Sequence, residues 1–392
     1  MTSVSRFDLF AVDLPFKAPF RHAAAVRATS GSLFLRVVLD DGVDGWGESL
    51  PRQYVSGESR ETAFGLLRDE ILPEMLGMEF GSLADVVAFL DKCDGKAPPE
   101  WVPSDVPQSS AWCCVDLALL DAIGRATSEE VVLGGAARAD SRPEHVRFSG
   151  VAPSNTGPRQ VVSLLKLRAF GFRQVKVKVD GDGAQRSVRT ARRALGRRTD
   201  IRVDANMAWD VDEALATIEG LRALGVGSVE QPIAPDDLDG LARLVRETGV
   251  VIMADEGLTD RDSLQTLIAQ RACTGANIRI SKCGGLIASH ARCLESLEGG
   301  LTLQVGCQVG ESSLLSVAQV NLLAALGRRD PGVRFAEGCF GRHLLRDDPV
   351  RPIVQFGYGG RPPSRPAGPG LGVTMDTALL ERYTLEHVRV RS

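Results

Sequence analysis

The sequence predicts an α/β protein, a TIM-type (β/α) barrel with an N-terminal α+β capping domain that the C-terminal segment completes. From about residue 145, short β-rich runs alternate with helical runs eight times, and eight parallel strands close such a barrel. The 392 residues exceed the roughly 200–250 residues of a barrel alone and leave room for a second domain. A charged residue also closes several of the β-rich runs, at intervals of about one strand plus one helix.

The composition changes along the chain, and these changes give the expected domain boundaries. Residues 1 to about 65 form strands and turns, and helical periodicity follows to about residue 127. An apolar helix in this region is interrupted by Asp116 and Asp121, which we expect to cap or pair rather than to bind a ligand. The expected domains are a capping domain over 1–130, a barrel over 131–345, and a Pro- and Gly-rich segment over 346–392 that returns to the capping domain.

The eight barrel strands are expected where β-rich runs lie between helical patterns. They are placed at residues 146–150, 174–179, 201–205, 228–231, 250–255, 277–282, 301–305 and 333–337.

Composition and charge exclude several classes of function. Apolar residues make up 44% and charged residues 24% of the chain, as in ordinary soluble enzymes. The net charge of -4 and the lack of a basic stripe argue against partners such as nucleic acid or a membrane surface. No signal peptide or membrane span is recognisable, so a cytoplasmic location is expected. The eight cysteines lack a zinc-type spacing, and a barrel enzyme of this size is expected to form a homo-oligomer.

Three acids close successive predicted strands. Asp204, Glu230 and Asp255 would supply hard oxygen ligands from adjacent strands, a set that suits Mg²⁺, with Mn²⁺ as a possible substitute. Asn206 shares the strand face of Asp204, because residues two apart point to the same side of a strand. Glu256 would replace Asp255 as a ligand if the strand were shifted by one residue.

Lysines accompany these acids at the strand ends. Lys176 and Lys178 share one face of the second strand, and Lys282 is expected to end the sixth. In one interpretation the lysines form salt bridges with the acids in a scaffold that catalyses nothing. In the other, a nearby cation and a second lysine lower the pKa of one lysine until it can take up a proton.

These residues together resemble the enolase superfamily and, within it, the muconate-lactonizing (muconate cycloisomerase-like) subgroup. The resemblance is carried by Lys-x-Lys at 176–178, by the three acids, and by Lys282 within Ser-Lys-Cys-Gly-Gly-Leu. Gly45-Trp-Gly-Glu48 is similar to the capping domain of that family, and Gly370-Leu-Gly-Val373 to its returning C-terminal strand.

The resemblance implies roles for individual residues. Asp204, Glu230 and Asp255 would bind the metal, and Lys178 and Lys282 would be general acid and base on opposite faces of the substrate. Lys176 would hold the substrate carboxylate, while Asn206 and Glu256 would lie just outside the ligands. Segments 16–30 and 50–58 match loops that close over the mouth, and Arg52 and Tyr54 are the candidates there for substrate binding. Glu311, after the seventh strand, matches the first residue of a Glu-Ser pair in cycloisomerase-like members and is a further candidate for substrate binding.

The expected activity is a Mg²⁺-dependent proton transfer alpha to a carboxylate through an enediolate, on a small-molecule substrate. Muconate-type cycloisomerisation is the first candidate. Dehydration of the o-succinylbenzoate synthase type, and racemisation or epimerisation of N-acylated amino acids, would use the same lysines. A Schiff-base aldolase on a barrel and a non-catalytic scaffold are the alternatives from other classes.

Overall fold

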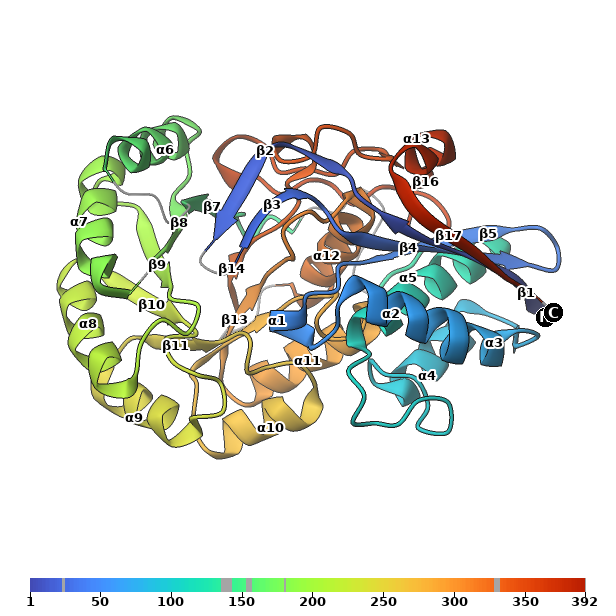
Figure 1. Cartoon of the computed structure of the whole chain (residues 1–392), viewed down its shortest axis with the longest axis horizontal. Helices are drawn as coiled ribbons and strands as arrows, with labels where there is room; N and C mark the ends of the chain where they lie inside the picture. The colour runs from blue at the N-terminus through green and yellow to red at the C-terminus, as the bar shows by residue number, and fades with distance from the viewer. Residues whose placement is uncertain (23–24, 135–142, 153–156, 180, 328–331, 392) are drawn as a thin grey trace.

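The computed structural model describes the chain except residues 23–24, 135–142, 153–156, 180, 328–331 and 392. A barrel of parallel strands with outer helices lies beside a capping domain that contains both chain ends (Figure 1). The predicted fold class is confirmed. Within the described residues, no helix is long and apolar enough to cross a membrane.

The barrel sheet contains eight strands in the order β14-β13-β12-β11-β10-β9-β8-β7, each parallel to its neighbours. A parallel bridge between Phe148 and Ala336 joins the two ends of this order and closes the ring. The strands are β7 Gly150–Ala152, β8 Gln174–Lys178, β9 Asp200–Asp204, β10 Val226–Glu230, β11 Val251–Ala254, β12 Gly275–Ile278, β13 Thr302–Val305 and β14 Val333–Ala336.

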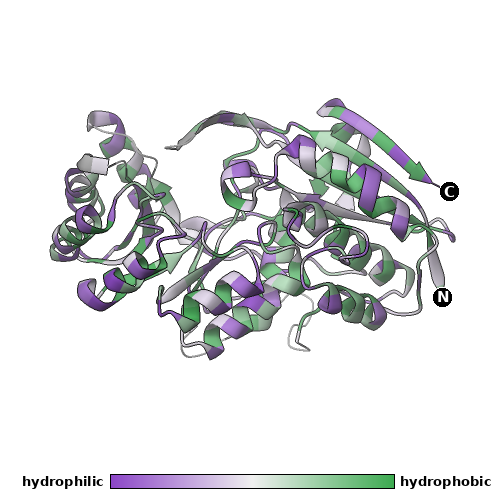
Figure 2. Cartoon of the chain, turned by 60° about the horizontal axis from the view of Figure 1, so that its bottom comes forward, coloured by the Kyte–Doolittle hydropathy of each residue, from purple (hydrophilic) through white to green (hydrophobic). Residues whose placement is uncertain are grey.

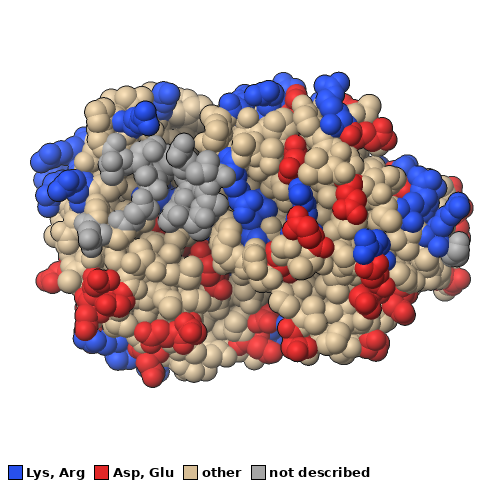
Figure 3. Space-filling model, in the orientation of Figure 1, with Lys and Arg blue, Asp and Glu red and all other residues tan. Residues whose placement is uncertain are grey.

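Helices surround the barrel, with apolar residues turned toward the strands (Figure 2). In α7 the buried positions are Ala184, Val188, Ala191 and Leu195, at the three- and four-residue spacing of one helix face. Arg186, Arg189 and Arg193 of this helix are exposed, and Figure 3 shows positive side chains on this side of the molecule. Arg192 is half-buried and donates to the backbone oxygens of Thr199 and Leu224. The helices are α6 Gly157–Ala169, η2 Gly181–Gly183, α7 Ala184–Leu195, α8 Val211–Ala223, α9 Leu238–Thr248, α10 Arg261–Ala269, α11 Leu286–Glu298 and α12 Ser313–Leu326.

Two strand predictions need correction. The sixth strand was expected over 277–282 but spans Gly275–Ile278, because Arg279 O begins a turn by accepting hydrogen bonds from the amides of Lys282 and Cys283. The first strand was expected over 146–150 but is β7, Gly150–Ala152. Within residues 146–149, Phe148 alone pairs with the sheet, through its bridge to Ala336.

The capping domain consists of an antiparallel sheet and the helices packed on it. Its strand order is β17-β1-β4-β5, with β6 also paired to β1, and β2 pairs with β3 in a separate hairpin. The elements of the N-terminal part are β1 Thr2–Val12, β2 Pro15–His22, β3 Ala25–Thr29, β4 Ser32–Leu39, β5 Asp44–Ser49, α1 Gln53–Ser56, α2 Arg60–Leu66, η1 Leu67–Ile71, α3 Leu72–Met75, β6 Glu79–Phe80, α4 Leu83–Cys93 and α5 Ser109–Ala126.

The C-terminal segment returns to this domain, as the fold prediction requires. The strand that joins the sheet is β17, which pairs antiparallel with β1, whereas Gly370 forms only a bridge with Glu130. The predicted returning strand near 370 was therefore placed too early. The elements are η3 Gly341–His343, β15 Val350–Arg351, η4 Tyr358–Gly360, β16 Thr374–Met375, α13 Thr377–Arg382 and β17 Thr384–Arg391.

Helix α5 is buried between the capping sheet and the barrel. Glycines in β5 allow its close approach, since a Cβ on Gly47 would lie 1.9 Å from the carbonyl oxygen of Cys114. Asp116 of α5 accepts hydrogen bonds from the amides of Leu286 (2.7 Å) and Ile287 (3.3 Å), at the first turn of barrel helix α11. The expected capping role of Asp116 is confirmed, and this cap joins the two domains.

Asp121 has an equivalent structural role inside the capping domain. Its carboxylate accepts from the amides of Trp46 (3.0 Å) and Leu371 (2.9 Å) and pairs with Arg125 at 2.9 Å. The expectation that this acid pairs rather than binds a ligand is also confirmed.

We expect Asp116→Ala to lower the free energy of unfolding by about 2 kcal/mol, because two buried amides at the start of α11 lose their acceptor. Urea unfolding followed by circular dichroism measures the loss. Asp116→Asn keeps one acceptor oxygen and should lose clearly less. Equal unfolding midpoints for the alanine variant and the unaltered chain would contradict the proposed cap.

Candidate active site

Charged side chains lie in one layer at the carboxyl ends of five neighbouring strands. Lys178, Asp204 and Glu230 are the last residues of β8, β9 and β10, while Asp255 and Arg279 directly follow β11 and β12. This end of a (β/α) barrel carries the active site in characterised enzymes of the fold. The predicted layer of strand-end charges is present, with Arg279 at its sixth-strand position.

Glu230 lies at the centre of the layer and is fully buried. Its carboxylate accepts hydrogen bonds from Lys176 Nζ at 3.2 and 3.3 Å, from Asn277 Nδ2 at 3.0 Å and from Gln304 Nε2 at 3.1 Å. Arg279 Nη2 lies 3.7 Å away. A buried carboxylate needs such partners, because desolvation without them is very costly.

Asp204 lies between the two lysines of β8. Its Oδ2 is 3.1 Å from Lys178 Nζ and 3.3 Å from Lys176 Nζ, and Lys178 also donates to Asn206 Oδ1 at 3.2 Å. Burial would raise the pKa of the Asp204 carboxyl, but the charges of Lys178 and Lys176 outweigh it and hold this pKa well below its usual range. Asp204 therefore stays ionised.

Arg279 was not singled out from the sequence. Its guanidinium forms an ion pair with Asp255, donates to Gln308 Oε1 at 3.2 Å, and lines the main cavity. Arg279 follows the last residue of β12 and is two residues from Asn277, which points inward to Glu230. This strand parity could have identified Arg279. The sixth strand was instead predicted to extend to Lys282, four residues beyond its observed end at Ile278.

Lys282 lies in the barrel wall, outside the cavity. Its side chain is fully buried, and Nζ donates to the backbone oxygens of Asp255 (2.6 Å) and Asn277 (2.8 Å) and to Asp255 Oδ1 (3.0 Å). Burial lowers the pKa of this ammonium to about 7. Lys282 is not among the described residues that line the cavity, so the predicted pairing of Lys282 with Lys178 across the site does not match the geometry.

Lys178 and Arg279 are the pair that the barrel places opposite each other. Lys178 ends β8 and Arg279 directly follows β12, and these strands are four apart in the ring of eight. Both line the same cavity. Asp204, Glu230 and Asp255 belong to the three strands between them.

Glu256 and Asn206 lie beside this layer and line the cavity. Asn206 Nδ2 donates to Glu256 Oε1 at 3.4 Å, while Glu256 Oε2 has no hydrogen-bond partner. Burial, followed by the negative charge of Asp204, raises the pKa of the Glu256 carboxyl to about 7. Asn206 also donates its backbone amide to Asp204 Oδ1 at 3.2 Å. That Asn206 and Glu256 orient metal ligands stays a prediction.

Glu337 is a second residue that the sequence analysis did not select. It directly follows β14, lies 2.7 Å from Lys176 Nζ, and forms an ion pair with the buried Arg202. The same rule that selected the other acids, a charge closing a barrel strand, could have found it.

The substrate-loop candidates separate into one that reaches the cavity and two that do not. Tyr54 lines the cavity. The buried Arg52 donates to four backbone oxygens, those of Ser30, Gly31, Pro51 and Val309. The prediction that Arg52 binds substrate needs correction, because its guanidinium is used to fix these loops.

Glu311 also has a structural role in place of the predicted one. Its Oε1 accepts from the amide of Gln308 at 2.6 Å, and burial raises the pKa of its carboxyl to about 8. Glu311 is not among the described cavity residues, whereas Gln308 is. The acid therefore shapes the loop that presents Gln308.

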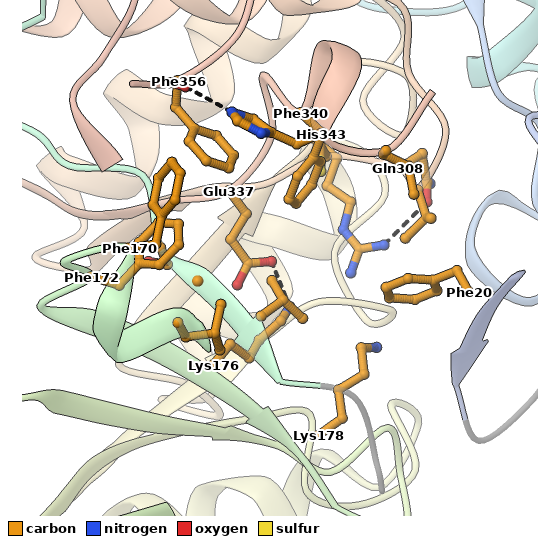
Figure 4. A pocket seen from close by; sticks show the side chains of 18 of the residues that line it. Phe20, Phe170, Phe172, Lys176, Lys178, Gln308, Glu337, Phe340, His343 and Phe356 are labelled. Carbon is orange, nitrogen blue, oxygen red and sulfur yellow. Dashed lines mark hydrogen bonds and ion pairs between the residues drawn. The ribbon is translucent and has the colours of Figure 1, made fainter. Parts of the chain in front are cut away.

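The cavity above these residues has a volume of about 530 Å³. Figure 4 shows Lys176, Lys178 and Glu337 at its base and Phe170, Phe172, Phe340 and Phe356 along the side away from Lys178. Phe20 and Gln308 lie on another side of the same space. The cavity thus joins a charged base to an aromatic wall.

The three strand-end carboxylates fit a hard divalent cation in their chemistry. Glu256 Oε2 is buried and lacks a hydrogen-bond partner, whereas Asp204 Oδ2 is paired with Lys178 and Lys176, so a bound cation would compete with these lysines for Asp204. Among the described residues no three His, Cys, Asp or Glu side chains converge on one point. Arg279 and the lysines lie against the carboxylates instead.

Two family models match the chain. Residues 160–379 match the model described as enolase C-terminal domain-like. Residues 6–133 match the N-terminal domain of mandelate racemase / muconate lactonizing enzyme.

The chain is similar to several characterised proteins at modest identity. It is 26% identical to muconate cycloisomerase 1 of Rhodococcus opacus, over 97% of this chain and 98% of that protein. It is also 26% identical to the N-succinyl-L-Arg/Lys racemase of Bacillus cereus, over 80% of this chain and 82% of that protein.

Solved structures show the same fold. The muconate lactonizing enzyme of Pseudomonas putida superposes with a TM-score of 0.80 at 26% identity, covering 97% of this chain and 99% of that one. A dipeptide epimerase of Cytophaga hutchinsonii, complexed with Mg and a dipeptide, has a TM-score of 0.82 at 20% identity, covering 99% and 100%. By its two domain matches, its barrel and its capping domain, the chain belongs to the enolase superfamily, in the mandelate racemase / muconate lactonizing enzyme group, and is an enzyme of the isomerase type.

Proposed function

We propose that this enzyme transfers a proton alpha to a substrate carboxylate with Lys178 as its single acid–base residue. The observation that carries the proposal is the position of Arg279, opposite Lys178 on the far side of the carboxylate layer. The first candidate reaction is a cycloisomerisation of the muconate type. One base suffices there, because the proton is delivered on the same face each time.

Arginine cannot replace the second lysine of a two-base enzyme. The guanidinium keeps its proton at every pH that a protein tolerates, so it cannot accept one from carbon. It can stabilise negative charge through its fork of N–H donors. Racemisation needs one group to remove the proton and another to return it on the opposite face, and Arg279 disfavours this reaction.

The lysines of the cavity would have different roles toward the substrate. Lys176 would hold the substrate carboxylate from the base of the site, where its charge is shared with Glu230 and Glu337. Lys178 is the more exposed of the two lysines, with 13% of its side chain accessible against 4% for Lys176. That exposure suits a residue that must reach the substrate carbon.

Mg²⁺, or Mn²⁺ in its place, would be held by Asp204, Glu230 and Asp255. When bound, such an ion acts as a Lewis acid that stabilises the negative charge developing on a carboxylate. Asn206 and Glu256 would orient the ligands.

A dehydration of the o-succinylbenzoate synthase type is the second candidate, because a single lysine can remove the proton and protonate the leaving group on one face. A Schiff-base aldolase using Lys178 and a non-catalytic scaffold remain as alternatives from other classes, and borohydride trapping and metal titration separate them. The proposed partner is a small-molecule carboxylate substrate. Assembly into a homo-oligomer and a cytoplasmic location both stay predictions.

We expect Lys178→Ala to reduce exchange of the substrate α-proton by about 10²- to 10⁴-fold, the usual contribution of a general acid–base residue. A panel of carboxylates in D₂O with Mg²⁺, followed by NMR, measures this. Lys92→Ala, on the exposed surface of α4, is the matched control and should exchange at the unaltered rate. Full exchange in the Lys178 variant would exclude Lys178 as the base.

We expect the unaltered enzyme to exchange the α-proton of a single enantiomer without producing the other enantiomer. Arg279→Lys should add slow racemisation, since it introduces a group that can lose and regain a proton. Chiral chromatography of the recovered substrate measures both outcomes. Racemisation by the unaltered enzyme at the rate of exchange would refute the single-base mechanism.

Mg²⁺ should bind with measurable heat in calorimetry and raise the thermal unfolding midpoint, because ligands that bind only the folded state stabilise it. Glu230→Gln should weaken this binding by about tenfold or more, since it removes one charged ligand. Asp212→Asn, on the exposed face of α8, is the control. Equal affinities in both variants would show that the ion binds elsewhere.

A further inference from the structure

The cavity has two chemically distinct ends. The charged end contains Lys176, Lys178, Arg279 and Glu337. The other end is formed by residues around the α6–β8 turn and in the segment after β14, and it is mostly apolar. Phe170, Phe172, Phe340 and Phe356 are labelled there in Figure 4.

The aromatic side chains form one connected wall. Phe356 lies at its centre, with ring centroids 5.6 Å from Phe172, 5.7 Å from Phe340 and 5.9 Å from Phe170. His343 stacks on Phe356 at 4.5 Å, and one of its ring nitrogens lies within hydrogen-bond distance, 3.0 Å, of the Phe356 carbonyl oxygen. Edge-to-face and stacked contacts of this kind fix the rings in place.

No negative charge of the described lining lies at this end. Glu256 and Glu337 are the carboxylates among the described cavity residues, and each is held at the charged end, beside Asn206 and Lys176 respectively. Lys166 lines the cavity from α6, next to Leu167. A cationic distal group would therefore meet apolar rings and a like charge, without a counter-ion.

We infer that the substrate is a carboxylate whose distal part is aromatic or a similarly bulky, uncharged apolar group. The inference rests on the proposed function, which places the carboxylate at the charged end beside Lys176 and Lys178. The distal group then extends toward Phe170, Phe172 and Phe356. A cavity of about 530 Å³ accommodates a molecule of that size, because ligand sites commonly measure roughly 300–1,000 Å³.

This assignment separates the enzyme from relatives whose names specify basic substrates, such as the N-succinyl-L-Arg/Lys racemase. Burial of a phenyl group in such a site increases affinity by about tenfold or more.

Calorimetric titration of the Mg²⁺-loaded protein with three matched acids tests the inference: phenylbutyrate, hexanoate and ε-aminohexanoate. Phenylbutyrate is expected to bind about tenfold more tightly than hexanoate or ε-aminohexanoate. Phe170→Ala should reduce its advantage over hexanoate to less than about threefold while hexanoate affinity is kept. Leu385→Ala, an exposed apolar residue of β17, is the control and should keep the full preference.

A variant that gains binding of a different acid must still be folded, so it separates a change at the apolar end from loss of folding. Leu167→Asp introduces a carboxylate at the apolar end and should shift the preference toward ε-aminohexanoate. Tight binding of ε-aminohexanoate to the unaltered protein, or an unchanged preference in Phe170→Ala, would overturn the substrate class.

Proton exchange separates this inference from the proposed function. Exchange that depends on Lys178 but occurs mainly with small carboxylates, or with carboxylates that carry a distal cation, would overturn the substrate class and leave the function standing. Selective phenylbutyrate binding without Lys178-dependent exchange in any aromatic carboxylate would overturn the function and leave the apolar site.

Discussion

The structure depends on charge neutralisation inside the barrel mouth. Five carboxyl groups and five cationic side chains meet there. Asp204, Glu230, Asp255 and Glu337 form ion pairs, without which their burial as carboxylates would be very costly, while Glu256 accepts a hydrogen bond from Asn206. Glu230 illustrates the constraint, since a lysine and two amides share its two oxygens. The carboxylates are Asp204, Glu230, Asp255, Glu256 and Glu337, and the cations are Lys176, Lys178, Arg202, Arg279 and Lys282.

The cationic side chains of the mouth differ in what they contact. Lys282 donates hydrogen bonds to the backbone carbonyls of Asp255 and Asn277, and the buried Arg202 forms an ion pair with Glu337. Lys178 and Arg279 remain in contact with the cavity. The chemical difference between these two, one able to release its proton and one not, narrows the reactions that the site can perform.

The capping domain is attached differently, through buried acids that accept hydrogen bonds at the start of barrel helices. Asp116 caps α11, and Glu48 accepts from the amide and hydroxyl of Ser312 before α12 at 3.0 and 2.6 Å. Burial raises the pKa of the Glu48 carboxyl to about 8. These contacts fix the capping domain relative to the mouth, so that Phe20 and Tyr54 can line the cavity.

The sequence by itself determined the barrel, the capping domain and the acids of the strand-end layer, because strand period, helix period and a charge closing several of the strands are local patterns. It did not determine which cation of the sixth strand faces the cavity. That depended on the end of β12 at Ile278. A turn follows there in place of the hydrogen bonds of the sheet, and it places Lys282 in the barrel wall, outside the cavity. Only the tertiary structure gathered the aromatic wall, since Phe170, Phe340 and Phe356 are distant in the chain and share no local pattern. Their contact arises from closure of the ring, which brings the α6–β8 turn beside the segment after β14.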